Sequence, residues 1–167
     1  MPRWKIDIRR VSITLICVLP ICALLFVIFV GPITNEVHLW QIRRQLKAIQ
    51  PPPETEEISS HSAIGLLVGN GNHCDFFAGT VYRTQSTPGT IQAHYQDIRF
   101  LNSISDEHED LSVTILRDPS SMDSVWLPND FDQPKDWGLT SDSYHGGTLF
   151  LLCVMRSYDA NGDFRCY

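Results

Sequence analysis

The longest run of apolar residues lies near the N-terminus, where no charged residue occurs between Arg10 and Glu36. About 20 helical residues, each rising about 1.5 Å, cross the roughly 30 Å hydrocarbon core of a bilayer. Residues 11–33 therefore predict a transmembrane helix that ends at Gly31-Pro32 and contacts the lipid bilayer. A cleaved signal peptide fits less well, because its apolar run is usually only about 7 to 15 residues long.

A shorter periodic segment follows. Four apolar residues recur at helical spacing and share one face of a helix: Leu39, Ile42, Leu46 and Ile49. Asn35 is the predicted N-cap of this helix, and three consecutive prolines end it at residues 51–53. We interpret residues 34–57 as an amphipathic stalk and a Pro-rich hinge. The apolar face of the stalk, with Trp40, is expected to lie on the bilayer or to dock on the body. The alternative is self-association of the stalk as a short coiled coil.

The remaining residues, 58–167, form the predicted body. Strands are predicted over 63–68, 76–82, 111–117 and 148–158, the last of them covered on both faces because it is nearly all apolar. Asn70-Gly71 favours a tight hairpin turn between the first two strands. A second Asn-Gly pair predicts a further hairpin that folds residues 164–167 back on residues 156–158.

A helix is predicted from a cap at Thr87 and a first-turn Pro88 through to Asn102, with residues 106–110 following as a solvated loop. Strands interrupted by one helix are typical of an α+β fold, with the helix packed on a mainly antiparallel sheet. Within this helix, the residues Thr87, Pro88, Ile91, His94 and Tyr95 form the pattern T-P-x-x-I-x-x-H-Y. Together with the single anchor, stalk and small body, the pattern resembles uncharacterised bacterial single-pass membrane-anchored proteins. That resemblance implies a protein of the bacterial cell envelope.

Charge divides the chain into a basic head and an acidic body. Residues 1–10 contain Arg3, Lys5, Arg9 and Arg10, and basic residues of this kind favour the cytoplasmic side of a membrane. We therefore expect a cytoplasmic N-terminus and an extracytoplasmic body. From residue 54 onward the chain holds 17 of its 19 acidic residues but only 6 of its 13 lysines and arginines, a formal charge of −11. An acidic body of this kind repels nucleic acid.

Catalytic and metal-binding motifs give little support to an enzyme. The chain contains no G-x-S-x-G, H-E-x-x-H, C-x-x-C or phosphate-loop pattern, and we expect no cofactor. The alternative function is a hydrolase or thiol-dependent enzyme that uses Cys74 and His145. Asp159, Asn161 and Asp163 begin like a calcium loop, but the glycine and the final acidic residue do not follow at the required spacing, so no metal site is expected.

A long segment with little periodicity, Asp118–Gly147, is the candidate binding surface. It combines three prolines with the aromatic residues Trp126, Phe131 and Trp137. Loops of this length are usually functional or disordered, and aromatic residues argue against disorder. The segment therefore predicts a contact with an envelope protein partner, and a carbohydrate that stacks on tryptophan is the second candidate ligand. The alternative is that the tryptophans cover the body's own core.

Three cysteines fall in the predicted body: Cys74, Cys153 and Cys166. An oxidising compartment favours one disulfide among them. In the predicted second hairpin, Cys153 and Cys166 are offset by about 13 Å, beyond the roughly 7 Å limit for a disulfide. We therefore predict a disulfide between Cys74 and Cys166, with Cys74–Cys153 and a fully reduced body as the alternatives.

Overall fold

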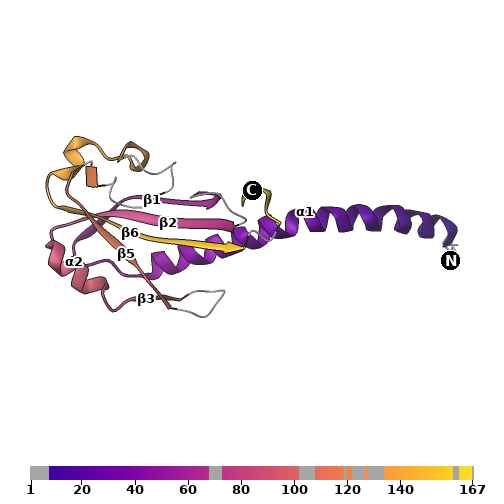
Figure 1. Ribbon diagram of the computed structural model, residues 1–167, viewed down its shortest axis with the longest axis horizontal. Helices are drawn as coiled ribbons and strands as arrows, with labels where there is room; N and C mark the ends of the chain where they lie inside the picture. The colour runs from indigo at the N-terminus through magenta and orange to yellow at the C-terminus, as the bar shows by residue number, and fades with distance from the viewer. Residues whose placement is uncertain are drawn as a thin grey trace, which may run out of the picture.

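The computed structural model describes residues 8–67, 73–101, 108–118, 120–121, 127, 134–159 and 162–166, and its fold is α+β, as the sequence predicts. Within these residues, one long and one short α-helix accompany a four-stranded antiparallel sheet and a small two-stranded sheet. The N-terminal half of the long helix projects from a body that contains the strands (Figure 1). The C-terminal half of the same helix lies against the four-stranded sheet.

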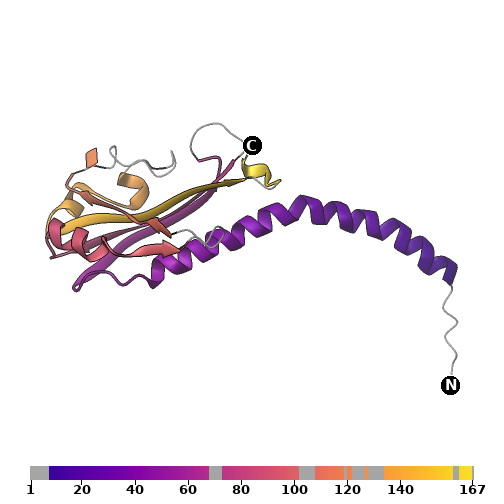
Figure 2. The ribbon, with the colours of Figure 1, turned by 60° about the horizontal axis from the view of Figure 1, so that its bottom comes forward.

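Helix α1 spans Ile8–Ala48 and continues through both of its prolines, Pro20 and Pro32. The predicted end at Gly31-Pro32 is therefore wrong, and Asn35 lies inside one helix instead of capping a second. A proline inside a helix removes one backbone hydrogen bond and bends the helix, and neighbouring contacts can offset that loss. Figure 2 shows α1 as a bent but unbroken rod.

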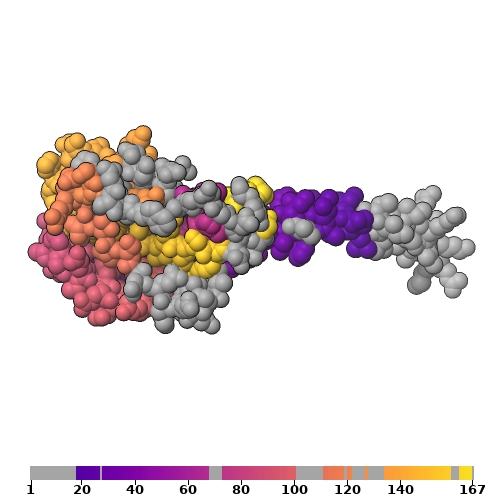
Figure 3. Space-filling model, viewed as in Figure 1, coloured from indigo at the N-terminus to yellow at the C-terminus, as the bar shows by residue number. Residues whose placement is uncertain are grey.

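The large apolar side chains of residues 18–26 and 28–30, in the projecting half of α1, are uncovered. Leu24 and Phe26, for example, are 61% and 68% exposed. The part of this half that is drawn in indigo stands clear of the body in the space-filling view (Figure 3). Among the described residues, α1 is the one helix whose length and composition suit a membrane span.

The C-terminal half of α1 docks on the sheet. Leu39, Ile42 and Leu46 are buried there, and they join a core that includes Phe76 and Leu152 of the sheet. The predicted amphipathic stripe is thus confirmed, and of its two expected partners it contacts the body. The helix and the sheet are one packed unit, because this contact buries Leu39, Ile42 and Leu46 and partly covers Ile49. Trp40, which was expected on the same face, is instead 55% exposed.

The four-stranded sheet has the order β1-β2-β6-β5, and every neighbouring pair of strands is antiparallel. Its strands are β1 (Thr55–Gly65), β2 (His73–Thr84), β6 (Thr148–Asp159) and β5 (Ser112–Leu116). The predicted hairpin pairing of β1 with β2 is confirmed, although its turn lies outside the described residues. The central position of β6 is also confirmed. Because β1 begins at Thr55, residues 55–57 belong to the sheet and not to the predicted hinge.

Helix α2 is shorter than the sequence predicts. It spans Pro88–Tyr95, and Thr87 caps it by accepting a hydrogen bond from the backbone nitrogen of Thr90 at 3.3 Å. The chain then forms β3, Arg99–Leu101, which pairs with β4, His108–Asp110. Residues 108–110 of the predicted loop are therefore a strand. Phe100 is buried, although a helix continued to Asn102 would have placed it beside the polar face.

The second face of the sheet is covered by short 3-10 turns instead of a helix. Two of them, η3 at Pro134–Trp137 and η4 at Ser141–Tyr144, lie within the predicted long loop. They pack with Leu127 and Leu139 on side chains of β2 and β6. Figure 2 shows the sheet between this layer and α1, so β6 is buried on both faces.

The C-terminal segment departs from the predicted second hairpin. Phe164–Cys166 forms the 3-10 turn η5, which lies beside α1 in place of a strand returning along β6 (Figure 1). Gly162 precedes it with a φ of +78°, a conformation that favours glycine. The contacts of this turn, described next, explain why it crosses to the helix.

Candidate functional site

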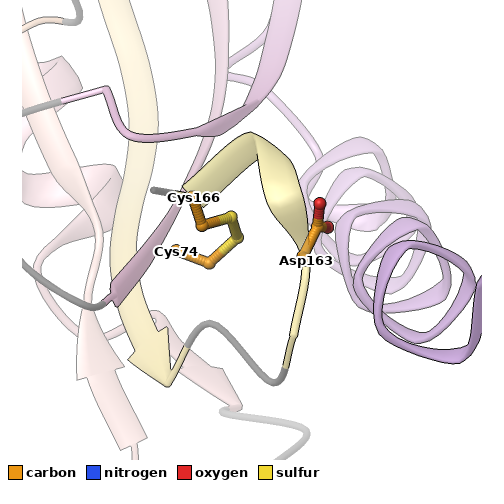
Figure 4. Close-up of side chains that lie close together, drawn as sticks. All are labelled: Cys74, Asp163 and Cys166. Atoms are coloured by element: carbon orange, nitrogen blue, oxygen red, sulfur yellow. A yellow bond between two sulfur atoms is a disulfide. The ribbon is translucent and has the colours of Figure 1, made fainter. Parts of the chain in front are cut away.

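A disulfide joins Cys74, at the start of β2, to Cys166 in η5, which confirms the predicted pairing. The two Cα atoms lie 4.9 Å apart, and both cysteines are fully buried. Figure 4 shows the bond between the strand and the C-terminal turn, with Asp163 on the side of the turn that faces α1. The bond therefore fixes η5 against the start of β2.

Asp163 is a fully buried carboxylate at this joint. Its Oδ2 atom accepts hydrogen bonds from Nδ2 of Asn35 at 3.0 Å and from Nη2 of Arg165 at 2.7 Å. Its Oδ1 atom accepts from the backbone nitrogen and from Nε of Arg165, at 3.1 and 3.0 Å. The hydrogen bond from Arg165 is the largest influence lowering the pKa of Asp163 below its usual range. The carboxylate is therefore deprotonated at neutral pH, and the positive charge of Arg165 balances its negative charge.

Arg165 carries the joint across to helix α1. Its Nη1 atom donates to Oε1 of Glu36, and its Nη2 atom donates to the backbone oxygen of Pro32 at 3.3 Å. The neighbouring Asn35 also donates from Nδ2 to Sγ of Cys74 at 3.4 Å. We call the six residues whose side chains make these contacts the C-terminal clamp: Asn35, Glu36, Cys74, Asp163, Arg165 and Cys166. It grips α1 where the projecting half leaves the body.

The chemistry of the clamp is that of a structural joint. The ligand atoms of Cys74, Asp163 and Cys166 lie within 4.8 Å of one another, a spacing that a metal ion could use. Metal binding by cysteine requires thiolates, however, and the disulfide removes both of them. The carboxylate of Asp163 is already paired with Arg165. The two cysteines are thus bonded to each other, and Asp163 is paired with Arg165 and Asn35.

The neighbouring residues of the stretch GNGNHCDFFAG serve the same joint. Asp75 is buried, and its carboxylate accepts hydrogen bonds from the backbone nitrogen of Leu67 at 3.0 Å and from the hydroxyl of Ser157. Nε2 of His73 lies 3.3 Å from Oδ1 of Asp75. These contacts tie β2 to β6 and to the end of β1 at the level of the disulfide. His73 and Asp75 therefore have structural contacts of their own.

The alternative catalytic pair is not brought together. Along β2 and β6, Cys74 lies opposite Tyr158, whereas Thr84 lies opposite Thr148, three residues after His145. At about 3.3 Å per residue, the ten residues from Cys74 to Thr84 span roughly 33 Å. His145 therefore lies near the end of the sheet far from Cys74, and a reaction that uses both side chains would need a different arrangement.

One of the three aromatic residues that were predicted to contact a partner, Trp137, is buried instead. Trp137 is only 1% exposed and packs edge-to-face against Phe77 and His61, with ring centroids 6.1 and 4.9 Å apart. Trp137 thus covers the body's own core, which was the alternative interpretation. Trp126 and Phe131 lie outside the described residues, so their role as partner contacts stays a prediction.

Sequence reasoning missed the polar half of the clamp. The sequence predicts Asn35 as a helix cap and Asp163 as part of a turn, because asparagine is common at helix N-caps and aspartate is common in turns. A signal was nevertheless present, since Asn35 and Glu36 are adjacent polar residues next to an otherwise apolar helical run. Buried polar side chains require partners, and here the partners come from the far end of the chain.

The fold and the clamp define an α+β body fixed to a helix that is long and apolar enough to cross a membrane. Comparison with known proteins finds no matching family model, no matching curated protein and no matching solved structure.

Proposed function

We propose that this protein is a single-pass membrane-anchored module whose body lies outside the cytoplasm and acts by binding a protein partner of the cell envelope, without catalysis. The observation that carries the proposal is the continuity of α1. One helix forms both the projecting apolar segment and a buried part of the body, and the C-terminal clamp grips it between the two. A body held in this way has a fixed position above the bilayer.

Two independent features support this orientation. The disulfide between Cys74 and Cys166 is stable in oxidising compartments, and the cytoplasm keeps most such cysteines reduced. The basic residues before the apolar segment, which include Arg9 and Arg10, favour a cytoplasmic N-terminus. Both features support a cytoplasmic N-terminus and an extracytoplasmic body.

The partner is expected to contact the segment that holds Trp126 and Phe131. Aromatic residues of this kind contribute strongly to protein interfaces when a partner buries them. The formal charge of −11 from residue 54 onward favours a partner with a basic surface, because complementary charge speeds association. Trp137 is no longer part of this prediction, because it is buried.

Orientation is tested on the full-length protein in intact cells. A protease-cleavable tag at the C-terminus should be cut by external protease once the outer layers of the envelope are made permeable. Cleavage only after lysis of the inner membrane would contradict the orientation. Retention in the pellet after alkaline extraction is expected for an integral anchor, and release would contradict the anchor.

Partner binding is tested with a photo-crosslinking amino acid at position 126 or 131, and at exposed Lys135 as the matched control. We expect a specific adduct from the first two positions in native membranes. A Trp126→Ala and Phe131→Ala double variant, probed by co-purification, should lose the partner while its melting temperature stays unchanged. Loss of folding in the double variant, or adducts equal to those of the control position, would contradict the proposal.

A further inference from the structure

The face of α1 opposite the buried stripe carries a second, uncovered stripe. Ile33, Val37 and Trp40 are 60%, 47% and 55% exposed, and they are spaced by four and three residues. Arg44 and Lys47 continue the same spacing and are also exposed. Residues at this spacing share one helix face. We call these five residues the outer stripe: Ile33, Val37, Trp40, Arg44 and Lys47.

The chemistry of the outer stripe changes in one direction along the helix. Apolar side chains stand nearest the projecting half, tryptophan follows, and the basic residues come last. The guanidinium carbon of Arg44 lies 5.4 Å from the ring centroid of Trp40, a cation-π distance. Two shallow grooves flank Trp40, one lined by Ile33 and Val37 and the other by Arg44 and Lys47. This order matches the order of hydrocarbon, interface and phosphate at a bilayer surface.

The length of the apolar segment places the outer stripe at that depth. The uncharged run from residue 11 to residue 35 is about 37 Å long as a helix, roughly 7 Å longer than a hydrocarbon core of about 30 Å. A span of this length tilts to fit. Trp40 follows five residues later, about 7.5 Å further along the axis. Because tilting fits about 37 Å of helix into about 30 Å, this rise becomes roughly 6 Å along the bilayer normal, and Trp40 falls within the headgroup layer, which adds roughly 5 to 7 Å on each side of the hydrocarbon core. Arg44 and Lys47 follow further along the helix, and their long side chains extend back toward the helix N-terminus to reach the phosphates.

We propose that the outer stripe binds anionic phospholipid headgroups of the leaflet from which α1 emerges, with Trp40 at the interface and Arg44 and Lys47 on lipid phosphate. This inference rests on the proposed membrane anchor. The acidic body is repelled by an anionic surface, whereas Arg43, Arg44 and Lys47 are the only lysines or arginines of the sequence between Arg10 and Arg83. They supply local positive charge where the helix leaves the bilayer.

A second copy of the chain is the competing occupant of this face. Two copies anchored in the same membrane would lie parallel, and their outer stripes would meet in register. Arg44 would then face Arg44, and Lys47 would face Lys47, an arrangement of like charges that opposes pairing. Lipid phosphate groups carry the opposite charge, so Arg44 and Lys47 favour binding to lipid over pairing with a second copy.

The test uses full-length protein in bilayer nanodiscs made from equal parts of phosphatidylcholine and phosphatidylglycerol. Native mass spectrometry then measures the ratio of anionic to zwitterionic lipid that the protein retains. In an Arg44→Gln and Lys47→Gln double variant the ratio should fall about 30-fold, or about five-fold for each charge removed. The matched control is Arg117→Gln with Lys135→Gln, which removes two exposed charges from the body. The control should retain wild-type lipid ratios.

A second readout locates Trp40 itself. The fluorescence difference between wild type and Trp40→Phe should be quenched by phospholipids brominated near the glycerol end of their acyl chains. Equal lipid ratios in wild type and the Arg44 and Lys47 variant would overturn the proposal. Absence of this quenching would also overturn the proposal. If crosslinked dimers then form through position 40, the outer stripe would be assigned to contact with a second copy of the chain. Release of the protein on alkaline extraction would instead refute the anchor on which the proposal rests.

Discussion

Replacing Arg165 with methionine should destabilise the body by breaking the C-terminal clamp. Methionine keeps much of the length of the side chain but removes its charge and every hydrogen-bond donor. Asp163 would keep only the hydrogen bonds from Asn35 and from the backbone nitrogen of residue 165, and Glu36 and the Pro32 carbonyl would lose their contact. The variant therefore leaves a fully buried carboxylate without its counter-charge.

The expected loss follows from that burial. Removing one partner of a buried ion pair typically costs about 3 to 5 kcal/mol. The side chain of Arg165 is 28% exposed, so solvent screens part of the interaction and the low end, about 3 kcal/mol, applies. For a body of this size the melting temperature should fall by roughly 10 to 15 °C. Arg117→Met, which changes an exposed arginine, should stay within about 0.5 kcal/mol of wild type.

The pH dependence of the loss follows from the lowered pKa of Asp163. A carboxyl group whose pKa is lower in the folded state stabilises the fold at pH values above its unfolded-state pKa, which is about 3.9 for aspartate. This stabilisation is lost as the pH falls through the pKa of the folded state. The difference between wild type and Arg165→Met should therefore be constant near pH 7 and shrink below about pH 4 as Asp163 becomes protonated.

Thermal unfolding of the full-length protein in detergent, followed by near-ultraviolet circular dichroism, measures these differences. The double variant Asp163→Asn with Arg165→Met should be more stable than the sum of the two single changes predicts, because it leaves no buried charge. Strictly additive losses, or an Arg165→Met variant as stable as Arg117→Met, would show that the clamp does not hold the helix.

Three further changes test the packing around the sheet in the same assay. Gly79→Ala should cost about 1 to 3 kcal/mol of stability, because a Cβ atom there would lie 3.0 Å from Cη2 of Trp137. Its control is Gly89→Ala, which meets open space in α2 and should be neutral or stabilising by up to about 1 kcal/mol. Trp137→Ala should cost about 3 to 5 kcal/mol, and a stable variant would show that this side chain is not part of the core. The double change Cys74→Ala with Cys166→Ala should cost about 4 kcal/mol, because the bond closes a loop across a separation of 92 residues, and unchanged melting would contradict that role.

The sequence alone determined those features that depend on local composition and period. The absence of charge between Arg10 and Glu36 predicts the long apolar helix, and the nearly continuous apolar run of residues 148–158 predicts a central strand. The cysteine pairing was also predicted, although one premise was wrong, because Cys166 lies in a 3-10 turn and not in a hairpin strand. The exclusion of Cys153 nevertheless holds, because its side chain packs in the core on the other face of the sheet from Cys74.

Only the tertiary structure decided what covers each apolar face and which polar residues meet. The spacing of Leu39, Ile42 and Leu46 defines an apolar stripe, but a bilayer, a second copy or a sheet would satisfy it equally. Residues 96–101 fit a helical period almost as well as a turn and a strand, and the pairing with residues 108–110 decides between them. Asn35 and Asp163 are 128 residues apart, and no local pattern links them. Such contacts form only when the whole chain folds, because the burial of one polar group requires a partner that a distant segment supplies.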